Sequence, residues 1–164
     1  MRLRFEPIDL GRDGDRCVAF REDAYTLSYG DADRFHGSDG LGAVRYLEKM
    51  RQRCERYPGS CVHAWEGDRI VGQIELTRLT DAWDTGHVAF YYLVPEVRGR
   101  GYGPQLDAYA LRYFTQVGCS AVQLGVARSN TRAIRFYQLH GWVEEGSFDG
   151  YGNVERMVHA LPAH

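Results

Sequence analysis

The pattern of apolar positions predicts a strand, a helix and a second strand between residues 88 and 126. Residues 88–94 form an unbroken apolar run rich in aromatic and β-branched side chains, which is typical of a strand covered on both faces. Pro95 has no backbone donor, so regular strand pairing should end there. Apolar side chains then recur at spacings of three and four from 104 to 117, which predicts an amphipathic helix. Residues 121–126 complete a βαβ unit as a second buried strand.

The same reading predicts the other elements in chain order. They are a strand at 3–7, a helix at 13–29, a long mobile loop at 30–40, a helix at 41–57, a hairpin of strands 61–65 and 69–79 around the turn 66–68, a link at 80–86, a helix at 129–139, and strands at 142–148 and 154–161 around the turn 149–153. This order predicts an α+β domain, a mixed α/β sheet with helices on both faces.

Glycines are concentrated where the first strand of the βαβ unit meets its helix. The stretch reads Arg98, Gly99, Arg100, Gly101, Tyr102, Gly103. Glycine admits positive φ and close approach of a ligand, and the amides that open a helix favour an anion. A tight turn would need one such glycine, so three glycines with two arginines favour a phosphate site.

Three familiar phosphate loops fit poorly. The spacing is not that of a dinucleotide fold, the Gly-Lys-Ser/Thr ending of a P-loop is absent, and so are the lysine and Asp-Phe-Gly partners of a kinase. Residues 93–103 instead resemble the acyl-CoA loop of the GNAT superfamily of N-acetyltransferases, whose signature is Arg/Gln-x-x-Gly-x-Gly/Ala. A second match to that family comprises Asn130, Ala133, Phe136, Tyr137, Gly141 and Trp142.

The resemblance implies a fold and a reaction. The fold would be a single GNAT-type domain over residues 1–164, three layers with a central, mostly antiparallel twisted sheet that is splayed at the CoA site. Acetyl-CoA would be the co-substrate, with no metal. A primary amine of a small molecule or peptide would attack the thioester directly in a ternary complex.

The family also implies where coenzyme A binds. Its pyrophosphate would lie on the main-chain amides of residues 98–103. Its pantetheine arm would meet the main chain of Tyr91 and Leu93, together with Asn130, which also suits a helix cap. A backbone amide at Leu93 or Val94 would stabilise the oxyanion.

Catalysis needs a proton donor and a base. Tyr137 matches the family's general acid, next to the CoA sulfur, although by spacing alone it would be a core aromatic of a helix. His87 lies where relatives place a carboxylate or histidine, and an exposed residue at a strand start is an equally good interpretation. Glu75 is a weaker candidate, and the base stays unassigned.

Composition and net charge argue against several classes of protein. A net charge of −2 over 164 residues and a pI near 6.3 argue against nucleic acid or an anionic membrane as the main partner. The start of the chain lacks a secretory pattern and no run is long enough to span a bilayer. Four scattered cysteines without metal spacing indicate free thiols in a cytoplasmic protein.

The acceptor is the least defined partner. In this family the first helices line the acceptor side, and here they carry acidic residues that could attract an amine: Glu22, Asp23, Asp31, Asp33 and Asp39. Acidic residues are equally common in solvated loops. A basic face of the next helix also argues against an acidic acceptor site: Arg45, Arg51, Arg53 and Arg56. A non-catalytic acyl-CoA-binding domain, a longer acyl group, a hydroxyl acceptor and a homodimer all stay open.

Overall fold

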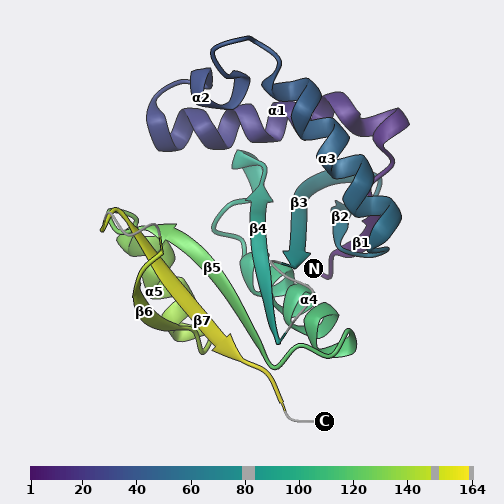
Figure 1. Ribbon diagram of the computed structural model, residues 1–164. Coiled ribbons are helices and arrows are strands. Elements are labelled where there is room, and N and C mark those ends of the chain that lie inside the picture. The colour runs from purple at the N-terminus through teal and green to yellow at the C-terminus, as the bar shows by residue number, and fades with distance from the viewer. Residues whose placement is uncertain (79–83, 149–151, 163–164) are drawn as a thin grey trace. The chain divides into compact units, whose positions relative to one another are not determined.

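The computed structural model describes residues 1–78, 84–148 and 152–162 (Figure 1). The chain divides into two compact units, which we describe separately. Unit 1 comprises Met1–Glu75 and Phe90–Gly103, and unit 2 comprises Leu76–Ala89 and Pro104–His164. Residues 80–83 of the expected link and 149–151 of the expected turn lie outside the described ranges.

Seven strands form one mixed sheet in the order β1-β2-β3-β4-β5-β7-β6. The pairs β1–β2, β2–β3, β5–β7 and β6–β7 are antiparallel and β4–β5 is parallel. The mixed, mostly antiparallel sheet predicted from the sequence is therefore confirmed.

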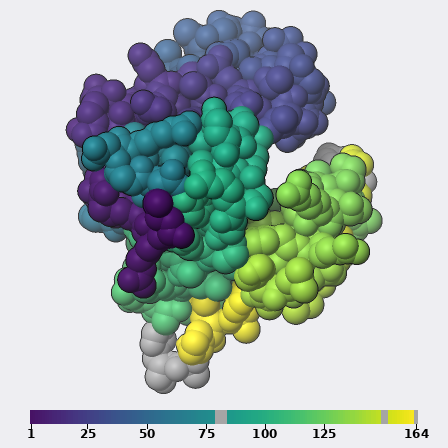
Figure 2. Space-filling view, turned by 180° about the vertical axis from the view of Figure 1, so that it is seen from behind, coloured from purple at the N-terminus to yellow at the C-terminus, as the bar shows by residue number. Residues whose placement is uncertain are grey.

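Unit 1 contains the N-terminal strand, three helices and a hairpin. Its elements are β1 (Arg4–Pro7), α1 (Leu10–Tyr29), α2 (Asp33–His36), α3 (Gly42–Arg56), β2 (Cys61–Glu66) and most of β3 (Arg69–Arg78). Helix α1 begins before its predicted start because the Asp9 carboxylate accepts a hydrogen bond from the Arg12 amide at 3.1 Å. In Figure 2 the helices, in purple to blue, form a continuous surface of this unit.

The stretch predicted to be only a loop contains the short helix α2, which corrects that prediction. The Asp31 carboxylate accepts a hydrogen bond from the Asp33 amide at 3.0 Å, and the side chain of Phe35 is buried. Four helical residues are too few for a 3.6-residue period to show in the sequence.

Strand β4 (Thr85–Leu93) runs through the boundary of the two units. Its side chains alternate between buried and half-buried along the whole strand, so one face is less covered than predicted. Pairing with β5 comprises Thr85, Gly86 and His87. The strand ends before Pro95, as predicted, and a 3₁₀ turn, η1 (Pro95–Val97), follows it.

Unit 2 contains the rest of the chain. Its further elements are α4 (Gly103–Gln116, whose first residue is assigned to unit 1), β5 (Ala121–Ala127), α5 (Thr131–Leu139), β6 (Val143–Ser147) and β7 (Val154–Ala160). Because β4 and β5 are parallel and joined through α4, the predicted βαβ unit is confirmed. Phe114, Trp142 and Met157 are the large, fully buried side chains of its core.

All four cysteines are free thiols. Among the described helices, none combines the length and apolar character needed to cross a membrane. No cluster of three or more potential metal ligands occurs in the part of the chain that the structure describes.

Candidate active site

The glycine loop of unit 1 leaves open space beside its backbone. Gly99 and Gly101 adopt φ values of 78° and 84°, which glycine alone adopts without strain. A Cβ atom built on either residue would meet no atom within 4 Å. These glycines are therefore required by the turn, and the space beside them could admit a ligand.

Several main-chain amides of the loop have no internal acceptor. Arg98 and Arg100 donate to the carbonyls of Pro95 and Val97, each at 3.3 Å. In the described structure no hydrogen bond is assigned to the amides of the four other loop residues: Gly99, Gly101, Tyr102 and Gly103. Gly103 also opens α4, where helix amides lack intrahelical acceptors. The loop can therefore offer several donors to an anion.

Side chains fix this loop to the rest of unit 1. Tyr102 is buried and its hydroxyl hydrogen-bonds to the carboxylate of Glu66. Arg98 donates from Nε to the carbonyl of Leu93 at 2.8 Å and forms an ion pair with Asp23 at 3.1 Å. Tyr102 thus anchors the loop by its side chain, which leaves its amide as the group available to a ligand.

The end of β4 distinguishes between the two amides considered for the oxyanion. The Val94 amide donates to the carbonyl of Val71 on β3 at 2.8 Å, so it is already used. Because successive amides of a strand point to opposite edges, the Leu93 amide points away from β3. Tyr91 shares that orientation by alternation, and both side chains are half-buried.

Tyr137 lies in unit 2 on α5, whose start is set by Asn130. The Asn130 side chain accepts from the Ala133 amide at 3.1 Å, which is the capping geometry expected from its position. Tyr137 is half-buried and meets Trp142 edge-on at a centroid distance of 5.7 Å. Asn130 thereby fixes the first turn of the helix that carries Tyr137.

The surroundings of Tyr137 keep its phenol protonated. Burial, and then the negative charge of Asp107, raise the pKa of Tyr137 above its usual value of 10.0. Asp107 is buried and accepts from the Trp142 indole at 3.2 and 3.3 Å. A neutral phenol is the form that can give a proton to a thiolate.

His87 also lies in unit 2, at the start of β4. It pairs with Gln123 across the parallel strands, and its ring stacks on Phe148 with 5.6 Å between centroids. The residue is half-buried. Its position fits either a base at a strand start or a packed surface histidine.

Glu75, the weaker candidate base, is occupied by other groups. It is fully buried and pairs with Arg21 at 2.6 and 3.3 Å. Tyr46 and Gln73 donate to its Oε2 at 2.7 and 2.8 Å. A carboxylate with these partners has no room for an incoming amine, so its role is structural.

The acidic residues considered for the acceptor do not gather into one site. Glu22 pairs with His36 at 2.9 Å, Asp23 with Arg98, and Asp39 with Arg45 at 2.7 Å. The Asp31 carboxylate accepts from the Asp33 amide next to α2. Two of the five carboxylates, those of Asp23 and Asp39, are thus paired with arginines of unit 1, which weakens the hypothesis of an acidic acceptor site.

Comparison with known proteins agrees with the resemblance seen in the sequence. A family model described as the acetyltransferase (GNAT) family matches residues 23–142. No curated protein matches the sequence.

Solved structures share the fold at low sequence identity. The PaiA N-acetyltransferase of Thermoplasma acidophilum, in complex with coenzyme A, has a TM-score of 0.76 and 16% identity over 98% of this chain and 100% of its own. The spermidine N-acetyltransferase of Vibrio cholerae, in complex with CoA and spermine, has 0.74 and 21% over 97% and 95%. The NatC complex bound to Gag peptide and CoA has 0.72 and 14% over 99% and 100%. Since the family model covers most of the described sequence and these structures share the fold, the chain belongs to the GNAT family of acetyltransferases.

Proposed function

We propose that residues 1–164 act as a single domain that transfers an acetyl group from acetyl-CoA to a primary amine of a small molecule or peptide. The observation that carries this proposal is the loop at 98–103, where several amides lack internal acceptors and two glycines face open space. Solved relatives hold coenzyme A together with spermine or a peptide, which supports both a CoA donor and an amine acceptor.

The proposal assigns a task to each of these residues. The loop amides and Arg100 bind the pyrophosphate, and the main chain of Tyr91 and Leu93 binds the pantetheine arm. Asn130 contacts that arm as well as capping α5. The Leu93 amide replaces Val94 as the oxyanion donor, because the Val94 amide already bonds to Val71.

The reaction is a direct acyl transfer. The neutral amine attacks the thioester carbonyl carbon, a C–N bond forms, and the C–S bond breaks as the tetrahedral intermediate collapses. The nitrogen loses one proton to a base, for which His87 is the candidate. The leaving thiolate gains one from Tyr137, the candidate general acid.

The test combines CoA binding with turnover. Calorimetry should show binding of CoA, and mass spectrometry should show acetylated products from a panel of amines. Replacing Tyr137 by Phe should lower kcat about a hundredfold with little change in CoA affinity. Tyr29→Phe, at an exposed tyrosine of α1, is the matched control and should leave kcat unchanged.

Three other outcomes would change the assignment. CoA binding without any turnover would indicate the acyl-CoA-binding alternative. Preference for longer thioesters in competition with acetyl-CoA would change the donor, and products acetylated on oxygen would change the acceptor. The cytoplasmic location and a homodimer stay predictions, which fractionation and analytical ultracentrifugation would test.

A further inference from the structure

A cavity of about 340 Å³ lies within unit 1, where α1, α2 and α3 meet. Five of its lining residues are cationic: Arg21, Arg34, Arg45, Lys49 and Arg53. The others are Gly42 and three aromatic residues, Tyr25, Phe35 and Tyr46, and none of the described residues that line the cavity is acidic. A cavity of this size could hold a small organic molecule.

Part of this positive charge is already balanced. Arg21 pairs with buried Glu75, and Arg53 lies 3.6 Å from the same carboxylate. Arg45 pairs with Asp39. Glu75 and Asp39 thus pair with three of the five cations: Arg21, Arg53 and Arg45.

Arg34 and Lys49 provide the remaining charge. Arg34 lies over the ring of Tyr29, with its Cζ 4.1 Å from the centroid. In the part of the chain that the structure describes, no ion pair is assigned to Arg34 or Lys49. The cavity therefore repels a polycation and attracts an anion.

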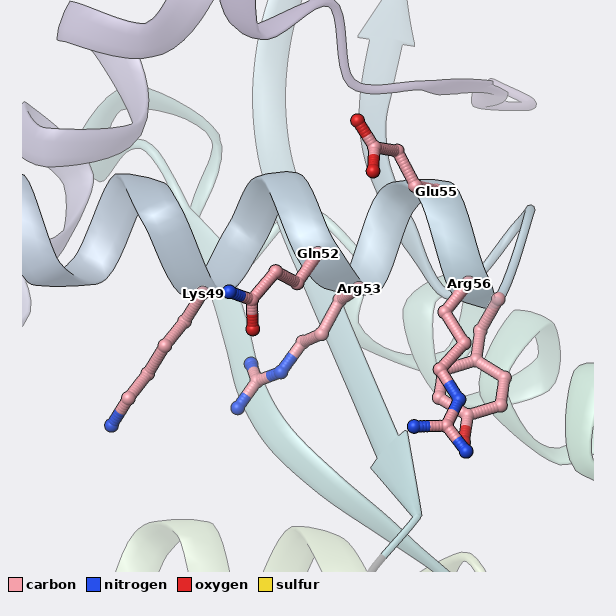
Figure 3. Close-up of a pocket in the computed structure, with 6 residues that line it drawn as sticks. Lys49, Gln52, Arg53, Glu55 and Arg56 are labelled. Carbon is pink, nitrogen blue, oxygen red and sulfur yellow. The ribbon is translucent and has the colours of Figure 1, made fainter.

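The basic surface continues along α3. Lys49 and Arg53 also line a neighbouring hollow together with Arg56. Figure 3 shows these three side chains extending from one side of the helix, with Glu55 on the other side. Glu55 also lines this hollow, and its carboxylate pairs with Arg51 at 2.8 Å.

One residue that lines the cavity contacts the strand to which we assign the pantetheine arm. The Arg21 guanidinium lies over the ring of Phe90, with its Cζ 4.0 Å from the centroid. Phe90 directly precedes Tyr91 on β4, within the same unit. Arg21 thus links the cavity to the strand that carries Tyr91.

We propose that this cavity binds an anionic group of the acceptor, so that the acceptor is an amine that also carries a carboxylate or a phosphate. This inference rests on the proposed function. It predicts that polyamines are poor acceptors, because a polyamine brings only positive charge to a cavity lined by arginine and lysine.

The first test uses acceptors in matched pairs. Amino acids are compared with their carboxamides, O-phosphoethanolamine with ethanolamine, and spermidine serves as the cationic acceptor. The anionic member of a pair should have the lower KM, and the two kinds of pair distinguish carboxylate from phosphate. Turnover without preference for either anionic member would overturn the inference and leave the acetyltransferase proposal standing.

Variants locate the effect in the cavity. Lys49→Gln and Arg34→Gln should each raise the KM of the anionic acceptor about tenfold, as loss of one charged hydrogen bond does, and leave that of its neutral partner unchanged. Arg51→Gln, on the same helix but paired with Glu48 and Glu55, is the matched control. An equal rise in KM in the control would contradict the inference.

A binding measurement keeps the two proposals separable. Inorganic phosphate or acetate is titrated into the protein and followed by NMR signals of the arginine and lysine side chains. Shifts at Arg34 and Lys49 that are lost in Lys49→Gln would support the anion site even if no amine were acetylated, and their absence would overturn it. Binding of a DNA oligonucleotide that depends on Lys49 and Arg53, without preference for anionic acceptors, would also overturn it in favour of nucleic acid.

Discussion

His63 shows how a single buried side chain can make stability depend on pH. It is fully buried, its Nε2 lies 2.8 Å from the Gln73 side-chain oxygen, and the Cys17 sulfur lies 3.7 Å away. Burial lowers the pKa of His63 below 6.5, and the hydrogen bond to Gln73 opposes that shift in part. The imidazole is therefore neutral in the folded protein at neutral pH.

The sign of the pH dependence follows from this lowered pKa. In acid the unfolded chain takes up a proton at His63 before the folded chain does, so the contribution of His63 to stability is complete above pH 6.5 and is lost as the pH falls through the folded pKa. Urea denaturation from pH 7.5 down to 5 should show a falling free energy of unfolding. In His63→Gln that slope should be weaker, whereas His36→Gln, at a less buried histidine, should keep it. Equal slopes in wild type and His63→Gln would refute the assignment.

Residues with local roles were the predictable ones. Asn130 was expected to cap a helix and does so through the Ala133 amide, because a cap depends on neighbours in sequence. The polar network around Glu75 was not predicted. Gln73 and Glu75 alternate with apolar residues on β3 and would ordinarily face water, yet both are buried, because Arg21 and Tyr46 reach them from distant helices.

At the scale of elements, the 98–103 loop offers the most direct test of coenzyme A binding. Gly101→Val should abolish measurable CoA affinity, because the side chain would fill the open space where we place the pyrophosphate. The strain of a positive φ comes with any such change and costs about 1–2 kcal/mol. Calorimetry with CoA measures the affinity, and circular dichroism confirms that the variant is folded.

Gly67→Val is the matched control for this strain. Gly67 also has positive φ and open space beside it, in the turn between β2 and β3. It should lose comparable stability while it keeps CoA affinity. Unchanged affinity in Gly101→Val would count against the loop assignment, and equal loss in both variants would point to strain alone.

The types of the elements and their order along the chain could be predicted from periodicity. The burial of each strand face and the short helix α2 could not. The strand 88–94 read as apolar throughout, but its burial alternates, since composition cannot show how much each face of a strand is covered. Helix α2 is held by one carboxylate and by the buried ring of Phe35. Such short-range contacts leave no periodic trace.

For the whole molecule, ligand binding should appear as added stability. A ligand that binds only the folded state at a concentration of one hundred times its Kd adds about 2.7 kcal/mol. Saturating CoA should therefore raise the melting temperature of the wild type, measured by calorimetry. Tyr137→Phe should show the same rise, because its defect is in proton transfer, and Gly101→Val should show none. A rise in Gly101→Val equal to that of the wild type would contradict the binding site.

The fold class was predictable and the pairing of distant strands was not. Local patterns predict the strands and every longer helix, though not α2, and the two family motifs place them in one known order. The insertion of β7 between β5 and β6 and its antiparallel register with β5 depend on contacts between residues far apart in sequence. Such long-range contacts cannot be read from local patterns in one sequence.

Gly42 lines the cationic cavity, and it limits which mutations could change the acceptors that the protein takes. A Cβ atom there would overlap the Phe35 carbonyl and crowd the His36 backbone. Even an alanine at this position would therefore push α3 away from α2. Substitutions of the charged side chains that line the cavity would leave this contact between α2 and α3 unchanged, whereas one added methyl group at position 42 would disturb it. If the cavity binds the acceptor as proposed, changes in acceptor preference should therefore come from the charged side chains, with glycine kept at position 42.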